Sequence, residues 1–183
     1  MTARAAAVLS LAFVACAWAP EGPDRMTLAV IAAEHNDSGN GVGGGRLTLE
    51  QGTDPEWSVH LASQWIASRA QDFPASGGSD WDSSGEFLFG ARRWWPVGPL
   101  GAGLGAEIGY GEGSPGDEDY ALAVALATLR WDLELGAGRT LGMEIDLHYR
   151  APLGLDGRSI GDGTPARDVF GGWLLFLGAS YAW

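Results

Sequence analysis

Residues 140–151, with the sequence TLGMEIDLHYRA, decide the fold class of this chain. Apolar side chains occupy the odd positions from Leu141 to Tyr149, and glycine or charged side chains occupy the even positions from Gly142 to Arg150. Successive side chains of a β-strand point to opposite faces, so this period of two predicts a strand with one apolar and one charged face. The same alternation recurs in residues 129–135, 99–111 and 173–183, which indicates an all-β chain.

Eight alternating segments can be marked along the chain. They span residues 25–35, 45–51, 56–68, 85–95, 99–111, 120–135, 140–151 and 169–183. Short turns rich in glycine and proline alternate with longer polar loops, which span residues 36–44, 69–84, 112–119 and 152–168. This connectivity is typical of an antiparallel up-and-down barrel with its short turns at one rim and its long loops at the other.

Length and composition narrow the class of protein. The 183 residues suit one domain, and the formal net charge of −12, with arginine as the only cation type, argues against a nucleic-acid partner. The single cysteine excludes a disulfide framework and a cysteine-rich zinc site. We therefore expect no nucleic-acid partner and no cofactor.

The first nineteen residues, MTARAAAVLSLAFVACAWA, have the layout of a secretory signal peptide. A single early arginine precedes an apolar run that is too short to span a bilayer, and small residues follow. We expect cleavage after Ala17 or Ala19, which leaves residues 20–183 as the barrel domain. Acylation at Cys16 is the alternative, although the preceding Phe-Val-Ala matches a leucine-led lipobox poorly.

Alternation alone does not say which face of the barrel points outward. A soluble, lipocalin-like barrel has its apolar face inside, whereas a membrane barrel has it outside, between two girdles of aromatic residues. The expected short-turn rim carries Trp57, Trp94, Trp95, Tyr181 and Trp183, with Trp131 somewhat higher. The expected long-loop rim carries Trp65, Tyr110, Tyr120, Tyr149 and Trp173. This sorting of aromatics to strand ends favours an eight-stranded antiparallel up-and-down transmembrane β-barrel.

The end of the chain agrees with that interpretation. An alternating apolar strand ends at Trp183, which is typical of the terminal signal that outer-membrane proteins present to their assembly machinery. We therefore expect a monomer in the cell outer membrane, in contact with the lipid bilayer and lipopolysaccharide.

An apolar outer face implies a polar lumen. The residues predicted to line it are Arg92, Glu107, Arg130, Asp132, Glu144, Asp146, His148 and Arg150, together with Glu50, His60, Gln64, Glu86 and Glu134. Eight strands enclose a lumen that side chains just fill, so we expect a structural plug of paired charges. A narrow cation-preferring channel or small-solute transporter is the alternative.

A lipid A-modifying enzyme is a second alternative, because deacylation and palmitoylation of lipid A both occur on barrels of this size. The deacylases carry a serine two residues after a histidine, whereas here Arg150 follows His148 and Ala62 follows His60. Ser180 is expected near the opposite rim from His148, so no nucleophile–base pair is predicted. Alternate strand positions lie about 7 Å apart, so Glu144, Asp146 and His148 alone do not form a metal site. We expect no catalysis.

Two acidic loop segments suggest cation binding. Asp80, Asp82 and Ser84 resemble the start of a calcium loop, but Ala91 stands where the bidentate glutamate is expected. Residues 116–119, Gly-Asp-Glu-Asp, add a second acidic cluster at the same rim. Solvated acidic loops are the favoured interpretation. Bridging divalent cations would connect such loops to the phosphates of lipopolysaccharide.

Several loop and turn motifs resemble the small YfaZ-type outer-membrane proteins. They are Gly98-Pro99-Leu100, the run from Gly116 to Ala121, the strand with Trp131, and Tyr149-Arg150-Ala151-Pro152. The resemblance covers the C-terminal half of the chain. It implies an outer-membrane barrel without an assigned activity and transfers no catalytic residue.

Overall fold

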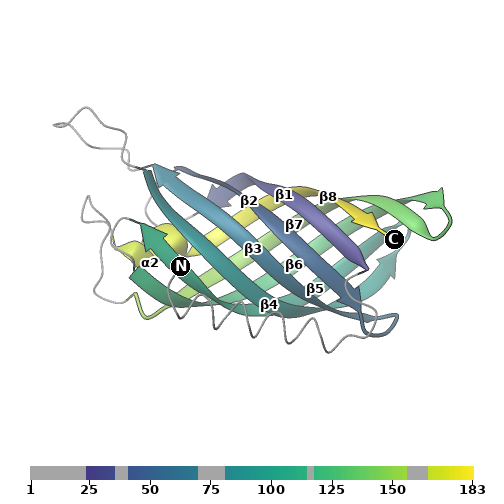
Figure 1. Cartoon of the computed structure of the whole chain (residues 1–183), viewed down its shortest axis with the longest axis horizontal. Helices are drawn as coiled ribbons and strands as arrows, with labels where there is room; N and C mark the ends of the chain where they lie inside the picture. The colour runs from purple at the N-terminus through teal and green to yellow at the C-terminus, as the bar shows by residue number, and fades with distance from the viewer. Residues whose placement is uncertain (1–23, 36–40, 70–80, 115–117, 156–164) are drawn as a thin grey trace.

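The computed structural model describes residues 24–35, 41–69, 81–114, 118–155 and 165–183, and these form a closed antiparallel barrel (Figure 1). Each strand pairs with its neighbours along the chain, and β8 closes the barrel against β1. The all-β, eight-stranded up-and-down barrel predicted from the alternation is therefore confirmed. The strands are β1 (Arg25–His35), β2 (Gly41–Gly52), β3 (Trp57–Arg69), β4 (Trp81–Val97), β5 (Leu100–Ser114), β6 (Glu118–Gly136), β7 (Arg139–Leu153) and β8 (Gly172–Ala182).

The predicted short turns are present at one rim. One of the two two-residue turns connects β6 to β7, where Gly136, Ala137 and Gly138 all have positive φ angles of 88°, 54° and 74°. Positive φ at both central residues is the geometry that joins two twisted antiparallel strands with least splaying. β1 begins and β8 ends at this short-turn rim, because Arg25 of β1 pairs with Ala182 of β8.

Several strands are longer than predicted, which shortens the connections at the long-loop rim. β2 begins at Gly41 because the glycine-rich run 41–45 pairs its backbone with β3, although it offers no side-chain alternation. β4 begins at Trp81, and only residues 115–117 connect β5 to β6. The strict alternation of short and long connections was therefore wrong at that position.

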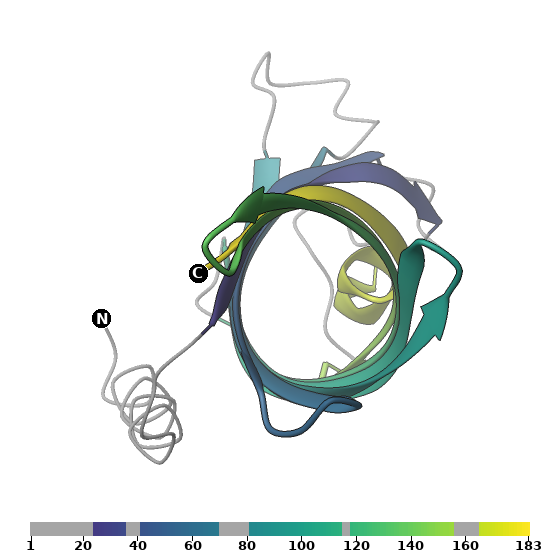
Figure 2. The same ribbon diagram turned by 90° about the vertical axis from the view of Figure 1, so that its right-hand side faces the viewer.

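A short helix, α2 (Ala166–Phe170), replaces the predicted start of the last strand. The alternation predicts a strand from residue 169, but β8 begins at Gly172, whose positive φ of 92° turns the chain from helix to strand. The side chain of Phe170 is buried and stacks on Tyr120 at 5.8 Å between ring centroids. Figure 2 shows α2 within the outline of the barrel, at the end opposite the short turns in Figure 1. No helix of the described residues is long and apolar enough to cross a membrane.

The outward face of the barrel is apolar. Ile108 and Val30 expose 68% and 60% of their surface, and every strand from β1 to β8 presents further large apolar side chains to the outside. Alternation explains this arrangement, because the intervening positions of the same strands are buried in the lumen.

Most of the predicted rim aromatics also point outward, but two do not. Trp57, Trp65, Trp95, Trp131, Tyr149, Trp173 and Trp183 are exposed. Trp94 instead turns inward, where its indole Nε1 donates to Glu50 at 2.9 Å and to Ser58 at 3.0 Å. Tyr120 is buried in the lumen. Neighbours on a strand point to opposite faces, so Trp94 cannot share the outer face of Trp95, nor Tyr120 that of Ala121.

Candidate functional site

The lumen holds the charged residues that the alternation placed on its inner face. Arg92, Glu107, Glu144, Asp146, His148 and Arg150 are buried there, with Glu50, His60, Gln64 and Glu86. Arg130 and Asp132 are half-buried at the short-turn rim. Glu134 is exposed, because β5 ends its pairing at Leu100 and Trp131, and the β6–β7 hairpin projects past that end. Placing Glu134 in the lumen was therefore wrong.

The inward face of β5 makes room for this network. Its inward positions are Gly101, Gly103, Gly105, Glu107, Gly109, Gly111 and Gly113. A Cβ added to Gly103 would lie 2.8 Å from Cδ of Arg92, and one added to Gly111 would overlap the ring of Tyr120. The glycines thus leave one wall of the lumen bare, and long side chains from β4 and β6 fill the space.

At the short-turn end, Arg25 closes the lumen. Its guanidinium makes two hydrogen bonds to the carboxylate of Asp132, at 2.8 and 3.0 Å, and a third to Oγ of Ser180 at 2.8 Å. Arg130 lies beside it, 3.4 Å from both Glu50 and Asp132, and its guanidinium carbon stands 3.9 Å from the centre of a Trp94 ring. This layer joins β1, β2, β4, β6 and β8, so it ties distant strands together.

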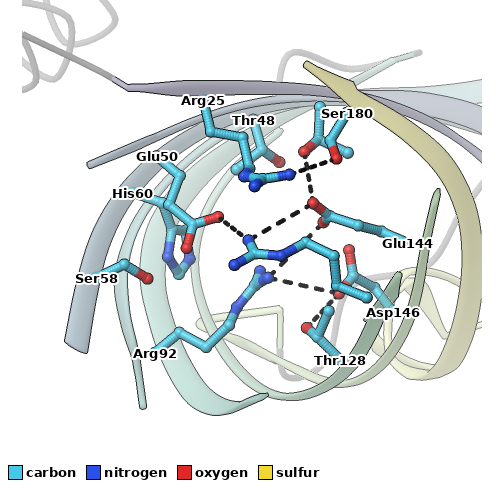
Figure 3. Close-up of polar contacts among 12 residues, drawn as sticks. Arg25, Thr48, Glu50, Ser58, His60, Arg92, Thr128, Glu144, Asp146 and Ser180 are labelled. Carbon is cyan, nitrogen blue, oxygen red and sulfur yellow. Dashed lines mark hydrogen bonds and ion pairs between the residues drawn. The ribbon is translucent and has the colours of Figure 1, made fainter. Parts of the chain in front are cut away.

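Further in, Arg92 lies between two carboxylates of β7. Its Nη1 atom is 3.8 Å from Asp146 and 3.9 Å from Glu144. Figure 3 shows Arg92 pointing towards these two side chains. Thr27 donates to Glu144 at 3.1 Å, and Thr128 donates to Asp146. Every charge of this layer therefore has an opposite charge or a hydroxyl group nearby.

A second buried cation, Arg46, belongs to a compact cluster around Glu107. It binds both oxygens of the Glu107 carboxylate through Nη1 and Nη2, Nη1 also donates to Gln64 at 2.9 Å, and Nε donates to Thr48 at 3.0 Å. His60 Nε2 lies 2.6 Å from the same carboxylate. The only carboxylate on the inward face of β5 is thus held by a cation and an imidazole.

Glu86 is the centre of the last polar layer. It accepts hydrogen bonds from Arg150, Gln64 and Tyr120, which come from β7, β3 and β6. Apolar side chains share the lumen with these polar layers. One cluster consists of Ala62, Leu88, Tyr120, Leu122, Val124, Leu155 and Phe170, and the other of Ala29, Ile66, Leu174 and Phe176. Polar and apolar side chains therefore both occur towards the long-loop rim, since Glu86 lies nearer that rim than Leu88 on β4, and Arg150 pairs with Gly172, nearer it than Leu174.

Sequence reasoning missed two members of the network, Arg25 and Arg46. The signal was present, because Arg25 alternates with Met26 and Leu28, and Arg46 shares its phase with Thr48 and Glu50. With them, five arginines (Arg25, Arg46, Arg92, Arg130 and Arg150) face six carboxylates (Glu50, Glu86, Glu107, Asp132, Glu144 and Asp146) among the described residues. The lumen is nearly neutral, whereas the predicted set had a large excess of acids.

The arrangement brings no nucleophile and base together. Ser180 pairs with Gly142 and His148 with Leu174, so the two side chains stand six residues apart along β7, or about 20 Å. Ser180 is bound to Arg25. His148 stacks at 4.8 Å on Phe176, and neither of its ring nitrogens has a hydrogen-bond partner among the described residues.

Two sequence predictions cannot be followed to their full extent. The signal peptide and Asp80 lie outside the described residues, as do residues 115–117, and the side chain of Asp82 is not described either. Ser84 is buried in β4, with its hydroxyl 2.5 Å from that of Tyr120. Within the described ranges, no group of three or more histidine, cysteine or acidic side chains could hold a metal ion.

Neither a family model nor a curated protein sequence matches this chain.

Proposed function

We propose that this chain is a small integral outer-membrane β-barrel protein with a plugged polar lumen and a structural or surface-interaction role. The proposal rests on one observation, which is that the apolar face of each strand points out of the barrel and the polar face points into the lumen. Large apolar side chains cover the outside, and ionised side chains fill the inside. Exposure of that apolar outer surface to water would cost a large free energy, whereas the hydrocarbon core of a bilayer solvates it.

The aromatic residues support the same proposal. Trp57, Trp95 and Trp183 stand on the outer face near the short-turn rim, and Trp65, Tyr149 and Trp173 stand there nearer the long-loop rim. Two girdles separated by aliphatic side chains match the two interfaces of a membrane. The signal-like layout of residues 1–19 supports export from the cytoplasm, and the resemblance to YfaZ-type proteins fits the same proposal.

The layered ion pairs support a plug and argue against a channel. Conduction needs a hydrated path, whereas Arg92, Glu107, Glu86 and Arg150 are almost inaccessible to water. The isolation of Ser180 from His148 likewise supports a role without catalysis. Contact with lipopolysaccharide would then involve the loops of the long-loop rim.

Fractionation combined with gel mobility tests the proposal. We expect the protein in the detergent-extracted outer-membrane fraction, with a folded band whose mobility changes on boiling. A protein that is soluble without detergent and shows no such change would overturn the membrane assignment.

Two functional measurements then test the proposed role. Purified protein in planar bilayers should give no discrete cation-selective conductance, and expression should leave the mass of lipid A unchanged. A conductance altered by Asp146→Asn would favour a channel. A lipid A mass change abolished by His148→Ala would favour an enzyme.

A further inference from the structure

β1 and β2 are paired over only part of their length. Their register runs from Arg25 and Glu50 to Val30 and Gly45 and ends there. Beyond that point β1 continues along β8 as far as His35, and β2 pairs with β3 from Gly41 onwards. We call the facing, unpaired ends, residues 31–35 and 41–44, the open seam. The carboxylate of Glu34 accepts a hydrogen bond from the Val42 amide, so the two ends lie side by side.

Apolar side chains lie directly behind the open seam. Ile31 and Val42 are half-buried and pack against the cluster of Ala29, Ile66, Leu174 and Phe176. The other neighbouring strands pair over most of the length that they share, with a register shift between Glu134 and Gly136 of β6. The seam thus presents Ile31 and Val42, in front of a buried apolar cluster, to whatever surrounds the barrel.

The seam also has open space on its outward side, at Gly43, and an unsatisfied acceptor. A Cβ added to Gly43 would meet no atom within 4 Å. The Oε2 atom of Glu34 is buried and has no hydrogen-bond partner among the described residues. A buried acceptor without a donor is costly, so this atom favours a ligand that brings an N–H or O–H group.

We propose that the open seam binds one acyl chain of a surrounding lipid, with the methylene groups on Ile31 and Val42 and a hydroxyl or amide donor of the lipid at Glu34. The proposal rests on the membrane location proposed above. Trp65 pairs with Gly45 at the inner end of the seam, and Trp173 pairs with His35 at its outer end. Both indoles are exposed at the girdle level. Glu34 lies nearer the rim than Ile31, so the polar head stays at the interface and the chain points towards the bilayer centre.

Photo-crosslinking tests this assignment on the full chain folded in phosphatidylcholine vesicles. The probes are a 3-hydroxy fatty acid with a diazirine in its chain and the matching fatty acid without the hydroxyl. We expect adducts, mapped by mass spectrometry, to concentrate on residues 31–34 and 42–44. They should be sparse around Ile108, which is exposed on β5 and paired on both sides.

Two bulky substitutions provide the matched comparison. Gly43→Phe fills the seam, and displacement of about two methylene groups should lower seam labelling about tenfold. Gly85→Phe adds the same ring to an equally open outward glycine two strands away and should leave seam labelling unchanged. Glu34→Leu should remove the preference for the hydroxylated probe.

The possible failures are distinct. Uniform labelling around the barrel, or equal labelling of both phenylalanine variants, would overturn the acyl-chain site. Seam labelling without a hydroxyl preference would overturn the role of Glu34. Gel mobility on the same samples reports insertion, so a protein that fails to insert contradicts the proposed function instead.

Discussion

At the scale of single residues, burial decides how much an ion pair contributes. The Arg46 and Glu107 side chains are 1% and 0% exposed, whereas those of Arg93 and Glu56 are 43% and 59% exposed. Glu107→Gln leaves the Arg46 charge buried without its counter-ion, which typically costs about 3–5 kcal/mol. We expect a loss of that size in the free energy of unfolding, measured by urea titration of the protein folded in vesicles.

Arg93→Ala is the matched control. Its ion pair with Glu56 lies in solvent at the short-turn rim, and such pairs contribute about 0–1 kcal/mol. Equal losses for the two variants would mean that water reaches Glu107, and the plugged lumen would have to be given up.

Replacing each of the two buried histidines by leucine should change the free energy of unfolding in opposite directions. His148 has no hydrogen-bond partner among the described residues, so His148→Leu removes an unsatisfied polar group and should raise the free energy of unfolding by about 1–3 kcal/mol. His60 contacts Glu107 at 2.6 Å, so His60→Leu should lower it by a similar amount. Urea titration of both variants checks the signs. Destabilisation by His148→Leu would mean that the imidazole has a bound partner, such as internal water.

Residue placement followed from the sequence most completely in the strand that its alternation marks most clearly. The phase of residues 140–151 placed Glu144, Asp146, His148 and Arg150 on one face, and the structure has all four in the lumen. The pairing of Glu86 with Arg150, and of Arg46 with Glu107, could not be predicted. Those contacts cross the lumen between strands that are not neighbours, and their choice depends on barrel register and on the space above the glycines of β5.

At the scale of an element, the glycine-lined inner face of β5 leads to a prediction that is opposite to the one from strand propensity alone. Valine is a far better strand former than glycine, yet Gly111→Val should destabilise the barrel by about 1–3 kcal/mol, because its Cβ falls on the Tyr120 ring. Gly85→Val places the same side chain on the outer face in open space and should be neutral or stabilising. Urea titration of the two variants makes the comparison, and a stabilising Gly111→Val would contradict the close approach of Tyr120.

Element order was predictable, but element ends were not. Alternation is lost in the glycine run of β2, so the extension to Gly41 depends on backbone pairing with β3 and leaves no mark in the hydropathy pattern. α2 was missed for a different reason. Phe170 and Trp173 suggest a continuous apolar segment, whereas Phe170 stacks on Tyr120 inside the lumen and the positive φ of Gly172 begins β8.

At the scale of the whole molecule, an arginine substitution on the outer face tests whether that face contacts lipid or water. Ile108→Arg places a cation at an exposed position in the middle of β5. In a bilayer that change costs about 2–4 kcal/mol, whereas on a water-exposed surface it is nearly neutral. Leu135→Arg, at the projecting β6–β7 hairpin, should cost little in either case. Unfolding titrations in vesicles measure both, and equal tolerance of the two arginines would argue for a water-facing barrel.

The near-neutral lumen has a consequence for the electrostatic repulsion between copies of the protein in one membrane. The lumen set contributes six acids and five arginines, a net charge of −1 with neutral histidines. The chain holds 23 acids and 11 arginines, so the other 17 acids and six arginines carry −11 of the total of −12. Counter-ions reach exposed charges such as those of Glu56 and Arg93 and not the buried pairs, since screening acts over about 8 Å of solution at physiological ionic strength. Salt should therefore leave the fold unchanged while reducing the mutual repulsion that sets how densely barrels crowd in one membrane.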